Sequence, residues 1–213
     1  MTPTNFQQNL LTWFDLYGRK DLPWQHPAKA YPVWVSEIML QQTQVVTVIP
    51  YFNKFIQQYP DIQALANAPL DEVLSQWAGL GYYARARNLH KTAIIINQSG
   101  HFPDSLAELV ALPGIGASTA GAILSIAFNQ SQAILDGNVR RVLARYKAIQ
   151  GWTGGTQVNK QLWEISARYT PEIRVADYTQ AIMDLGATIC TRSKPRCTEC
   201  PLQSDCLALQ QQR

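Results

Sequence analysis

The sequence predicts an all-α fold. Twelve prolines and twelve glycines divide its 213 residues into segments of helix length, and the apolar side chains of these segments recur every three or four residues. Nowhere do apolar and polar residues alternate over four or more positions clearly enough to indicate a strand. With 46% hydrophobic and 15% charged residues, the chain can bury a sizeable core and is not expected to be disordered.

Apolar stripes support this prediction in chain order, and each is interpreted as the buried face of a helix. They cover residues 6–17, 35–49, 89–96, 123–128, 139–146 and 178–185. Further helices are expected to begin after Pro60-Asp61, Pro69-Leu70-Asp71 and Pro103-Asp104-Ser105, because Asp and Ser cap helix N-termini.

Membrane and secreted classes are excluded by what the sequence lacks. No apolar run approaches the roughly 20 residues of a membrane span. Residues 1–11 have neither the charged region nor the long apolar region of a secretory signal. All four cysteines lie between positions 190 and 206, which indicates a metal site in a reducing compartment rather than a disulfide framework. We therefore expect a cytoplasmic protein.

The positive charge of the chain is concentrated in its second half. The formal net charge is +3, but residues 132–213 carry 11 basic and 7 acidic groups, a net charge of +4. The pI of about 8.7 is below that of a dedicated nucleic-acid-binding domain. A polyanionic partner is expected to contact mainly the second half.

The cysteines form the most specific motif, Cys190-x6-Cys197-x2-Cys200-x5-Cys206. Free cysteines seldom group this tightly, and four thiolates hold either zinc or an iron–sulfur cluster. Zinc ribbons usually pair their ligands as two short C-x2-4-C units, whereas only the middle gap here is of that kind. The spacing favours a 4Fe–4S cluster, with zinc as the alternative.

A second motif is the turn Leu112-Pro113-Gly114-Ile115-Gly116 between two expected helices, 104–111 and 117–128. Its glycines allow a sharp turn and a close approach of the backbone to a ligand. The free N–H groups of the following helix would bind a phosphate oxygen without regard to base. An ordinary turn between helices explains the same residues equally well.

Two acidic residues are candidates for chemistry. Glu37 has Val33, Trp34 and Leu40 at helical spacing, and desolvation beside them would raise its pKa enough to donate a proton near neutrality. A lone Glu on a helix usually faces solvent, so this role is the less common one. Asp136 precedes a basic helical segment, where Asp is a routine N-cap that also fixes its carboxylate in space.

Residues 79–91, with the sequence GLGYYARARNLHK, combine a glycine turn and two tyrosines with a helix start that carries cations and no acid. Aromatic side chains beside Arg and Lys suit insertion into a duplex and contact with phosphates. A packed tyrosine pair under a solvated helix is the structural alternative.

Together these motifs resemble the helix-hairpin-helix DNA glycosylases with an iron–sulfur loop, over essentially all 213 residues. The resemblance implies two helical lobes on either side of a DNA groove, into which a flipped base enters. Residues 30–131 would form a six-helix barrel that carries the hairpin. Residues 1–29 and 132–213 would form the iron–sulfur lobe.

The resemblance also implies roles for single residues. Gln41 and Tyr82 match residues that fill the space left by the flipped base, and Gln41 would share a helix face with Glu37. Trp24, Ser118 and Asn138 match positions that line the base pocket or support its acids. The remaining expected DNA contacts are Gln42, Arg85, Arg87, Leu112, Gly114, Gly116 and Arg140.

Within the family, the resemblance favours a monofunctional enzyme that removes adenine mispaired with 8-oxoguanine or guanine. Glu37 would protonate adenine N7, and Asp136 would stabilise the oxocarbenium ion. Lyase-type members carry a lysine at the position of Ser118 and lack the acid at the position of Glu37. The expected partner is double-stranded DNA with adenine mispairs, bound by a monomer at the bacterial nucleoid.

Two other functions remain open at this point. One is an endonuclease III-like glycosylase and lyase for damaged pyrimidines, against which Glu37 and Ser118 argue. The other is a non-catalytic DNA-binding module in which the metal loop is only architectural.

Overall fold

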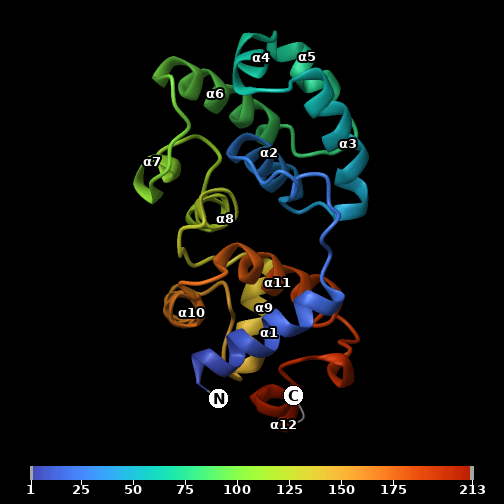
Figure 1. Ribbon diagram of the computed structural model, residues 1–213, viewed down its shortest axis with the longest axis vertical. Coiled ribbons are helices and arrows are strands. Elements are labelled where there is room, and N and C mark those ends of the chain that lie inside the picture. The colour runs from blue at the N-terminus through green and yellow to red at the C-terminus, as the bar shows by residue number, and fades with distance from the viewer. Residues whose placement is uncertain (1, 212–213) are drawn as a thin grey trace. The chain divides into compact units, whose positions relative to one another are not determined.

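The computed structural model describes residues 2–211, and within this range it contains helices and no strand (Figure 1). The predicted all-α fold is confirmed. The chain divides into two compact units. Residues 20–128 form the continuous unit, and the described parts of residues 1–19 and 129–213 form the composite unit. No helix among the described residues is long and apolar enough to cross a membrane.

The continuous unit is built around two apolar helices that pack against each other, α2 (Ala30–Leu40) and α8 (Ala117–Phe128). Its largest fully buried side chains include Trp34, Phe55 and Trp77. The other helices are α3 (Val45–Gln58), α4 (Ile62–Asn67), α5 (Leu70–Gln76), α6 (Ala84–Ser99) and α7 (Leu106–Val110).

The predicted helix starts in this unit are confirmed. The Asp61 carboxylate accepts a hydrogen bond from the backbone N–H of Ala64 at 2.8 Å and caps α4. Pro69 is the N-cap residue of α5, and Ser105 caps α7 by accepting from the N–H of Glu108. The Asp61 and Ser105 side chains satisfy N–H groups that have no partner within their own helices, whereas Pro69 makes no side-chain cap hydrogen bond.

The sequence predicted that the apolar stripe over residues 35–49 is the buried face of one helix. In the structure these residues belong to two helices. Helix α2 ends at Leu40 and α3 begins at Val45. Between them Gln42 adopts a left-handed backbone conformation with φ of 59°, which a continuous helix cannot contain. Gln41 is the C-cap residue of α2, and its place on the same helix face as Glu37 stays a prediction.

The composite unit packs α1 (Pro3–Tyr17) against α10 (Thr156–Tyr169) and α11 (Val175–Thr188). Helix α9 (Gly137–Tyr146) contacts α10, α11 and the short α12 (Leu207–Gln210). Two 3-10 turns, η1 (Cys197–Glu199) and η2 (Gln203–Asp205), lie in the cysteine segment. The Phe6 ring packs edge-on against Tyr146 and Tyr169, with ring centroids 4.9 and 4.7 Å apart. Tyr17, placed in the buried stripe by the sequence, is 72% exposed.

Residues 20–29 belong to the continuous unit, although the expected lobes grouped them with the N-terminal helix. Leu22 and Trp24 are buried, and the Trp24 ring lies edge-on to Phe52 with centroids 5.2 Å apart. Residue 131 belongs instead to the composite unit, where the Ser131 hydroxyl donates to the Pro171 carbonyl oxygen at 3.0 Å. The observed limits are therefore 20 and 128, where 30 and 131 were expected.

Candidate functional site

Asp136 lies at the N-cap of α9, where its carboxylate is fixed by two donors. Oδ1 accepts from the backbone N–H of Val139 at 2.7 Å, and Oδ2 accepts from the Asn138 side-chain amide at 3.4 Å. The side chain is half-buried, and burial raises the pKa of Asp136 above its ordinary value. The backbone N–H groups of Val139 and Asn138 and the charge of Arg141 oppose this shift.

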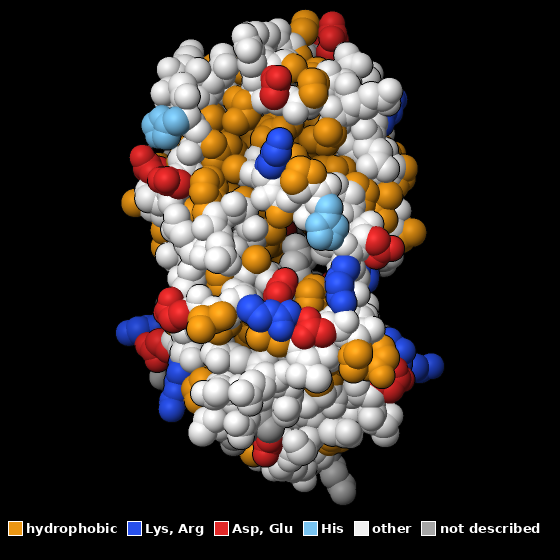
Figure 2. All heavy atoms as spheres, viewed as in Figure 1, with side chains coloured by type: hydrophobic (Ala, Val, Ile, Leu, Met, Phe, Trp, Pro, Cys, Tyr) orange, Lys and Arg blue, Asp and Glu red, His pale blue; other side chains and the backbone are white. Residues whose placement is uncertain are grey.

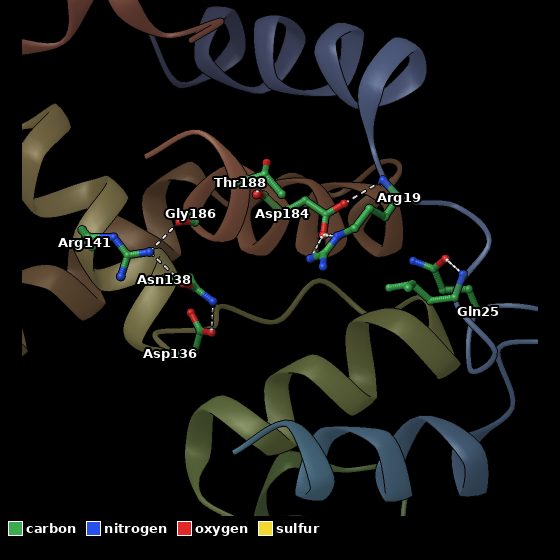
Figure 3. A network of polar contacts seen from close by, with 9 residues as sticks. Arg19, Gln25, Asp136, Asn138, Arg141, Asp184, Gly186 and Thr188 are labelled. Carbon is green, nitrogen blue, oxygen red and sulfur yellow. Dashed lines mark hydrogen bonds and ion pairs between the residues drawn. The ribbon is translucent and has the colours of Figure 1, made fainter. Parts of the chain in front are cut away.

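Asn138 is held in turn by Arg141, one turn further along α9 (Figure 3). One guanidinium nitrogen, Nη2, donates to Asn138 Oδ1 at 2.8 Å and to the Gly186 carbonyl oxygen at 2.5 Å. The Nε of Arg141 donates to the carbonyl oxygen of Cys190 at 2.6 Å. A chain of hydrogen bonds therefore runs from the Asp136 carboxylate to the start of the cysteine segment.

Glu37 lies in α2 of the continuous unit and is half-buried. Of its neighbours at helical spacing, Val33 and Trp34 are buried, with at most 1% of their surface exposed, and Leu40 is half-buried. These apolar neighbours provide the surroundings that the sequence analysis expected for a proton donor. Asp136 belongs to the composite unit, so the two candidate acids come from different parts of the chain.

Two turns of the continuous unit carry Gln41 and Tyr82, which were expected to fill the space left by the flipped base, and Gln42, which was expected to contact DNA beside them; Gln41 is half-buried. Gln42 and Tyr82 are both exposed, and both have left-handed backbone conformations, with φ of 59° and 51°. Gln41 Nε2 donates weakly to the Gly114 carbonyl oxygen at 3.5 Å and to Thr119 Oγ1 at 3.4 Å. Apolar side chains show over much of the face of this unit in the upper part of Figure 2, and Val46 and Tyr82 are its most exposed large ones.

Arg85 and Arg87 differ in the structure, although both were expected to bind DNA. Arg87 is exposed on α6. Arg85 is only 8% exposed, and its terminal nitrogens donate to backbone carbonyl oxygens, among them those of Met39 at 2.7 Å and Gln41 at 2.6 Å. The prediction that Arg85 contacts phosphate is therefore wrong, because its guanidinium donates to carbonyl oxygens inside the protein.

The hairpin turn joins α7 to α8, as predicted, but its residues are not equally accessible. Gly114 and Gly116 are exposed, and Gly114 has a φ of 80°, a conformation that favours glycine. The Leu112 side chain is only 9% exposed and belongs to the core, so only its backbone is available to DNA. Ser118 is half-buried in the first turn of α8.

Two further predicted residues have mainly packing or local contacts. Trp24, expected in a base pocket, is 2% exposed and packs in the core of the continuous unit. Its role at a base pocket stays a prediction. Arg140 is half-buried, and its Nη1 donates to the Thr153 carbonyl oxygen at 2.5 Å.

The four cysteines line one cavity of about 230 Å³ in the composite unit, together with apolar residues such as Leu185, Ile189 and Leu202. Burial raises the pKa of Cys200 to about 11 and also raises that of Cys206. Such thiols ionise only beside strong positive charge, which bound metal supplies. Within residues 2–211, no three His, Cys, Asp or Glu side chains are arranged to hold a single metal ion. Four thiols spread around a cavity are the donor set of an iron–sulfur cluster.

Arg145 ties this cavity to α9. Its Nη1 donates to Cys190 Sγ at 3.4 Å and to the Thr191 carbonyl oxygen at 2.7 Å, and its Nη2 donates to the Arg192 carbonyl oxygen at 3.1 Å. The sequence analysis missed the structural roles of Arg141 and Arg145. Their spacing of four residues in a helix, which places both on one face, was the available signal.

Comparisons with known proteins agree with this arrangement. Residues 35–168 match the HhH-GPD superfamily base excision DNA repair protein family, and residues 190–206 match the iron–sulfur binding domain of endonuclease III. The second match confirms the predicted 4Fe–4S cofactor.

Curated relatives cover nearly the whole chain. It is 51% identical over 97% of its length to the adenine DNA glycosylase of Buchnera aphidicola subsp. Baizongia pistaciae (strain Bp) and 46% identical over 97% to that of Homo sapiens. The chain spans 59% and 40% of these relatives' own lengths.

Solved structures share the fold. A thermostable thymine-DNA glycosylase matches with a TM-score of 0.85 and 27% identity, over 98% of this chain and 97% of its own. A non-covalent endonuclease III–DNA complex matches with a TM-score of 0.80 and 20% identity, over 100% of this chain and 98% of its own.

Proposed function

The chain belongs to the HhH-GPD superfamily of base excision DNA repair proteins, and on this basis we propose that it is a monofunctional adenine DNA glycosylase. It would hydrolyse the N-glycosidic bond of adenine mispaired with 8-oxoguanine or guanine in double-stranded DNA. The names of relatives that are 40–51% identical over most of the chain support adenine as the base that is removed. Neither the endonuclease III-like lyase nor the non-catalytic module has an observation that favours it.

The observation that carries the proposal is the fixed carboxylate of Asp136. Two donors hold it at the start of α9 in half-buried surroundings, where a charge acts more strongly than in water. As adenine leaves, the sugar acquires oxocarbenium character, and a carboxylate already in place stabilises this cation without reorganisation. The donors to Asp136 act against burial and favour its ionised form.

Glu37 is the proposed general acid. Protonation of adenine at N7, directly or through water, makes the base a neutral leaving group. Positioned acids of this kind contribute about 10²–10⁴-fold to a rate. The same carboxylate, once deprotonated, would activate the attacking water. Its half-buried place among apolar side chains of α2 supports this role.

The absence of a lyase step follows from the residues at two positions. Ser118 has no amine and cannot form a Schiff base with the abasic sugar. Arg140 carries a guanidinium and not an amine, and this group donates to the Thr153 carbonyl oxygen. The product would therefore be an intact strand with an abasic site.

The proposed DNA contacts are the exposed parts of the predicted set. Gln42 and Tyr82 project from two turns of the continuous unit, and Gly114 and Gly116 present the hairpin backbone. Arg87 and Arg140 add positive charge, and Asn138 orients Asp136. Gln41 lies beside the hairpin.

Cys190, Cys197, Cys200 and Cys206 would hold the cluster, which gives the surrounding loop a folded core. The same loop carries Arg192, Lys194 and Arg196, whose charges suit phosphate contacts. We further propose that the protein acts as a monomer on DNA in the bacterial cytoplasm, at the nucleoid.

The proposal is tested with a duplex that contains adenine opposite 8-oxoguanine, incubated with the protein and then treated with alkali. Cleavage at the adenine only after alkali is the expected result, because base loss without strand scission leaves an alkali-labile site. Cleavage before alkali, or cleavage of an oxidised-pyrimidine duplex in its place, would point to the lyase-type alternative. Binding without release of any base would point to the non-catalytic one.

A further inference from the structure

Arg85 is a buried arginine whose two terminal nitrogens have many acceptors, although its Nε is buried without a partner among the described residues. It lies in the first turn of α6 and is 8% exposed, and the four N–H groups of its two terminal nitrogens are shared among six oxygen acceptors. All six acceptors belong to the continuous unit, and they fall in two short segments, residues 38–43 and 80–81. One guanidinium group therefore cross-links two turns that are about 40 residues apart in the chain.

Two of the acceptors are carbonyl oxygens that directly precede residues with left-handed backbone conformations. Nη1 donates to the carbonyl oxygen of Gln41 at 2.6 Å, and Nη2 donates to that of Gly81 at 3.1 Å. These carbonyls directly precede Gln42 and Tyr82, two non-glycine residues in the left-handed region, with φ of 59° and 51°. Such conformations cost free energy and persist only where surrounding contacts enforce them.

Arg85 and its neighbour Trp77 make further contacts with the same two turns. Its guanidinium lies 5.5 Å from the ring centroid of Trp77 and 5.4 Å from that of Tyr82. The Trp77 indole N–H donates to the Gly81 carbonyl oxygen at 3.2 Å. Nη2 also donates to Thr43 Oγ1 at 3.2 Å, on the far side of Gln42. The left-handed residue of the first turn is thus bracketed by acceptors of Arg85.

We propose that Arg85 is a positioning residue that holds the Gln41–Gln42 turn and the Gly79–Tyr82 turn in one fixed arrangement, so that their exposed side chains enter the duplex together. This inference rests on the proposed function. It adds that extrusion of the base depends on Arg85, a residue that does not touch DNA. Arg85 has no accessible charge for phosphate, because its terminal nitrogens face backbone carbonyls inside the protein.

A lysine at position 85 would keep the positive charge but could not make the same set of hydrogen bonds. A guanidinium offers donors in a rigid planar fork, whereas an ammonium group offers three from a single atom. Arg85→Lys would leave acceptors of one turn without a partner and release its backbone. A displacement of about 1 Å in a positioning group costs about 100-fold in rate, and we expect a loss of this size in base extrusion and base release.

The test uses the full chain with its cluster. A duplex carries 2-aminopurine in place of the target adenine, and its fluorescence rises when the base leaves the stack. Extrusion is recorded in a Glu37→Gln background, which blocks base release. Single-turnover release of adenine opposite 8-oxoguanine is recorded in the parental background. Affinity for an undamaged duplex, thermal unfolding and cluster absorbance are measured for each variant.

Arg168→Lys is the matched control, since Arg168 is exposed on α10 and the exchange is chemically the same. Thr43→Val is the milder second variant, because it keeps the shape of the side chain and removes one acceptor of Arg85. We expect Arg85→Lys to lose extrusion and release while its affinity for undamaged duplex stays parental. Thr43→Val should lower extrusion about fivefold, the loss that corresponds to one hydrogen bond.

Each outcome decides the inference. Parental extrusion in both variants would overturn it, and so would an equal fall in extrusion and in affinity for undamaged duplex, which indicates a general loss of structure. If Arg85→Lys does not fold, the result with Thr43→Val decides alone. If the parental protein extrudes 2-aminopurine but releases no adenine, the proposed substrate is wrong. The positioning role is then judged from extrusion alone: a loss in Arg85→Lys supports it, and parental extrusion contradicts it. If the parental protein does neither, both proposals fail.

Discussion

Gly186 and Asn138 are closer than a side chain on Gly186 would permit. A Cβ added to Gly186 would lie 2.6 Å from the Cβ of Asn138 and 3.0 Å from its Cα and carbonyl carbon. Gly186 belongs to α11, and Asn138 belongs to the first turn of α9. Because Asp136 caps that same turn, the place of its carboxylate depends on glycine at position 186.

Gly186→Ala should therefore impair catalysis. The methyl group would press on the backbone of Asn138, and the first turn of α9 must move. We expect single-turnover adenine release to fall about 100-fold and the protein to lose about 1–3 kcal/mol of unfolding free energy. Gly137→Ala is the control for stability, because a Cβ at Gly137 meets no atom within 4 Å. Parental rates in Gly186→Ala would show that α9 does not set the position of Asp136.

Asp136→Asn should separate stability from activity. The amide oxygen still accepts from the N–H of Val139, and Asn is as good an N-cap as Asp, so the unfolding free energy at pH 7 should change by less than about 1 kcal/mol. Adenine release should fall about 100- to 1,000-fold, because a neutral amide does not stabilise the cation. Single-turnover kinetics and thermal unfolding of both proteins measure these effects.

The same variant has a pH signature with a defined sign. Burial raises the folded-state pKa of Asp136 above its ordinary value, so this group binds its proton more tightly in the folded than in the unfolded state. The corresponding stability is present below the ordinary pKa of Asp and is lost as pH rises through the folded-state pKa. Relative to the parental protein, Asp136→Asn should therefore be more stable at neutral pH than at low pH. A relative stability that runs in the opposite direction would contradict the burial of this carboxylate.

Borohydride should trap little covalent adduct between the protein and DNA. A trapped adduct needs an amine at the abasic sugar, whereas Ser118 carries a hydroxyl and Arg140 a guanidinium. The reaction is followed by denaturing gel electrophoresis, with a lyase-type glycosylase as positive control. An adduct as abundant as that of the control would revive the bifunctional interpretation.

Cys200→Ser should reduce the iron content and weaken DNA binding. The parental protein should contain about four irons per chain, and a serine hydroxyl is a poor ligand for the cluster. Iron analysis and visible absorbance measure occupancy, and Ser204→Ala in the same loop is the control. Stoichiometric zinc without iron in protein purified under reducing, anaerobic conditions would refute the iron–sulfur assignment.

Much of the fold could be predicted because it depends on local patterns. Asp61 and Ser105 cap helices where the sequence placed them, and the cysteine spacing identified the metal centre. The break at Gln42 could not be predicted, because apolar spacing continues through it and the contact that enforces it comes from Arg85, far along the chain. Helix α10 was missed, although Val158, Leu162, Ile165 and Tyr169 recur at helical spacing in residues 156–169.

The sequence predicted which types of residue form the candidate site. It did not predict what each side chain contacts. A run of basic residues does not reveal which side chain faces solvent, and so Arg85 and Arg87 were given the same role. The structure separates them, because one guanidinium finds backbone acceptors and the other does not become buried. Arg141 and Arg145 illustrate the same limit, since their partners in the cysteine segment lie more than 40 residues away.

The central claim is that Glu37 donates the proton with which adenine leaves. Its most direct test compares the parental protein with Glu37→Gln on a duplex with adenine opposite 8-oxoguanine, in single-turnover release and in equilibrium binding. We expect Glu37→Gln to bind the duplex with parental affinity and to release adenine at least about 100-fold more slowly, because the amide keeps the shape of the side chain and has no proton to donate. A release rate near the parental one would show that the general acid is another group.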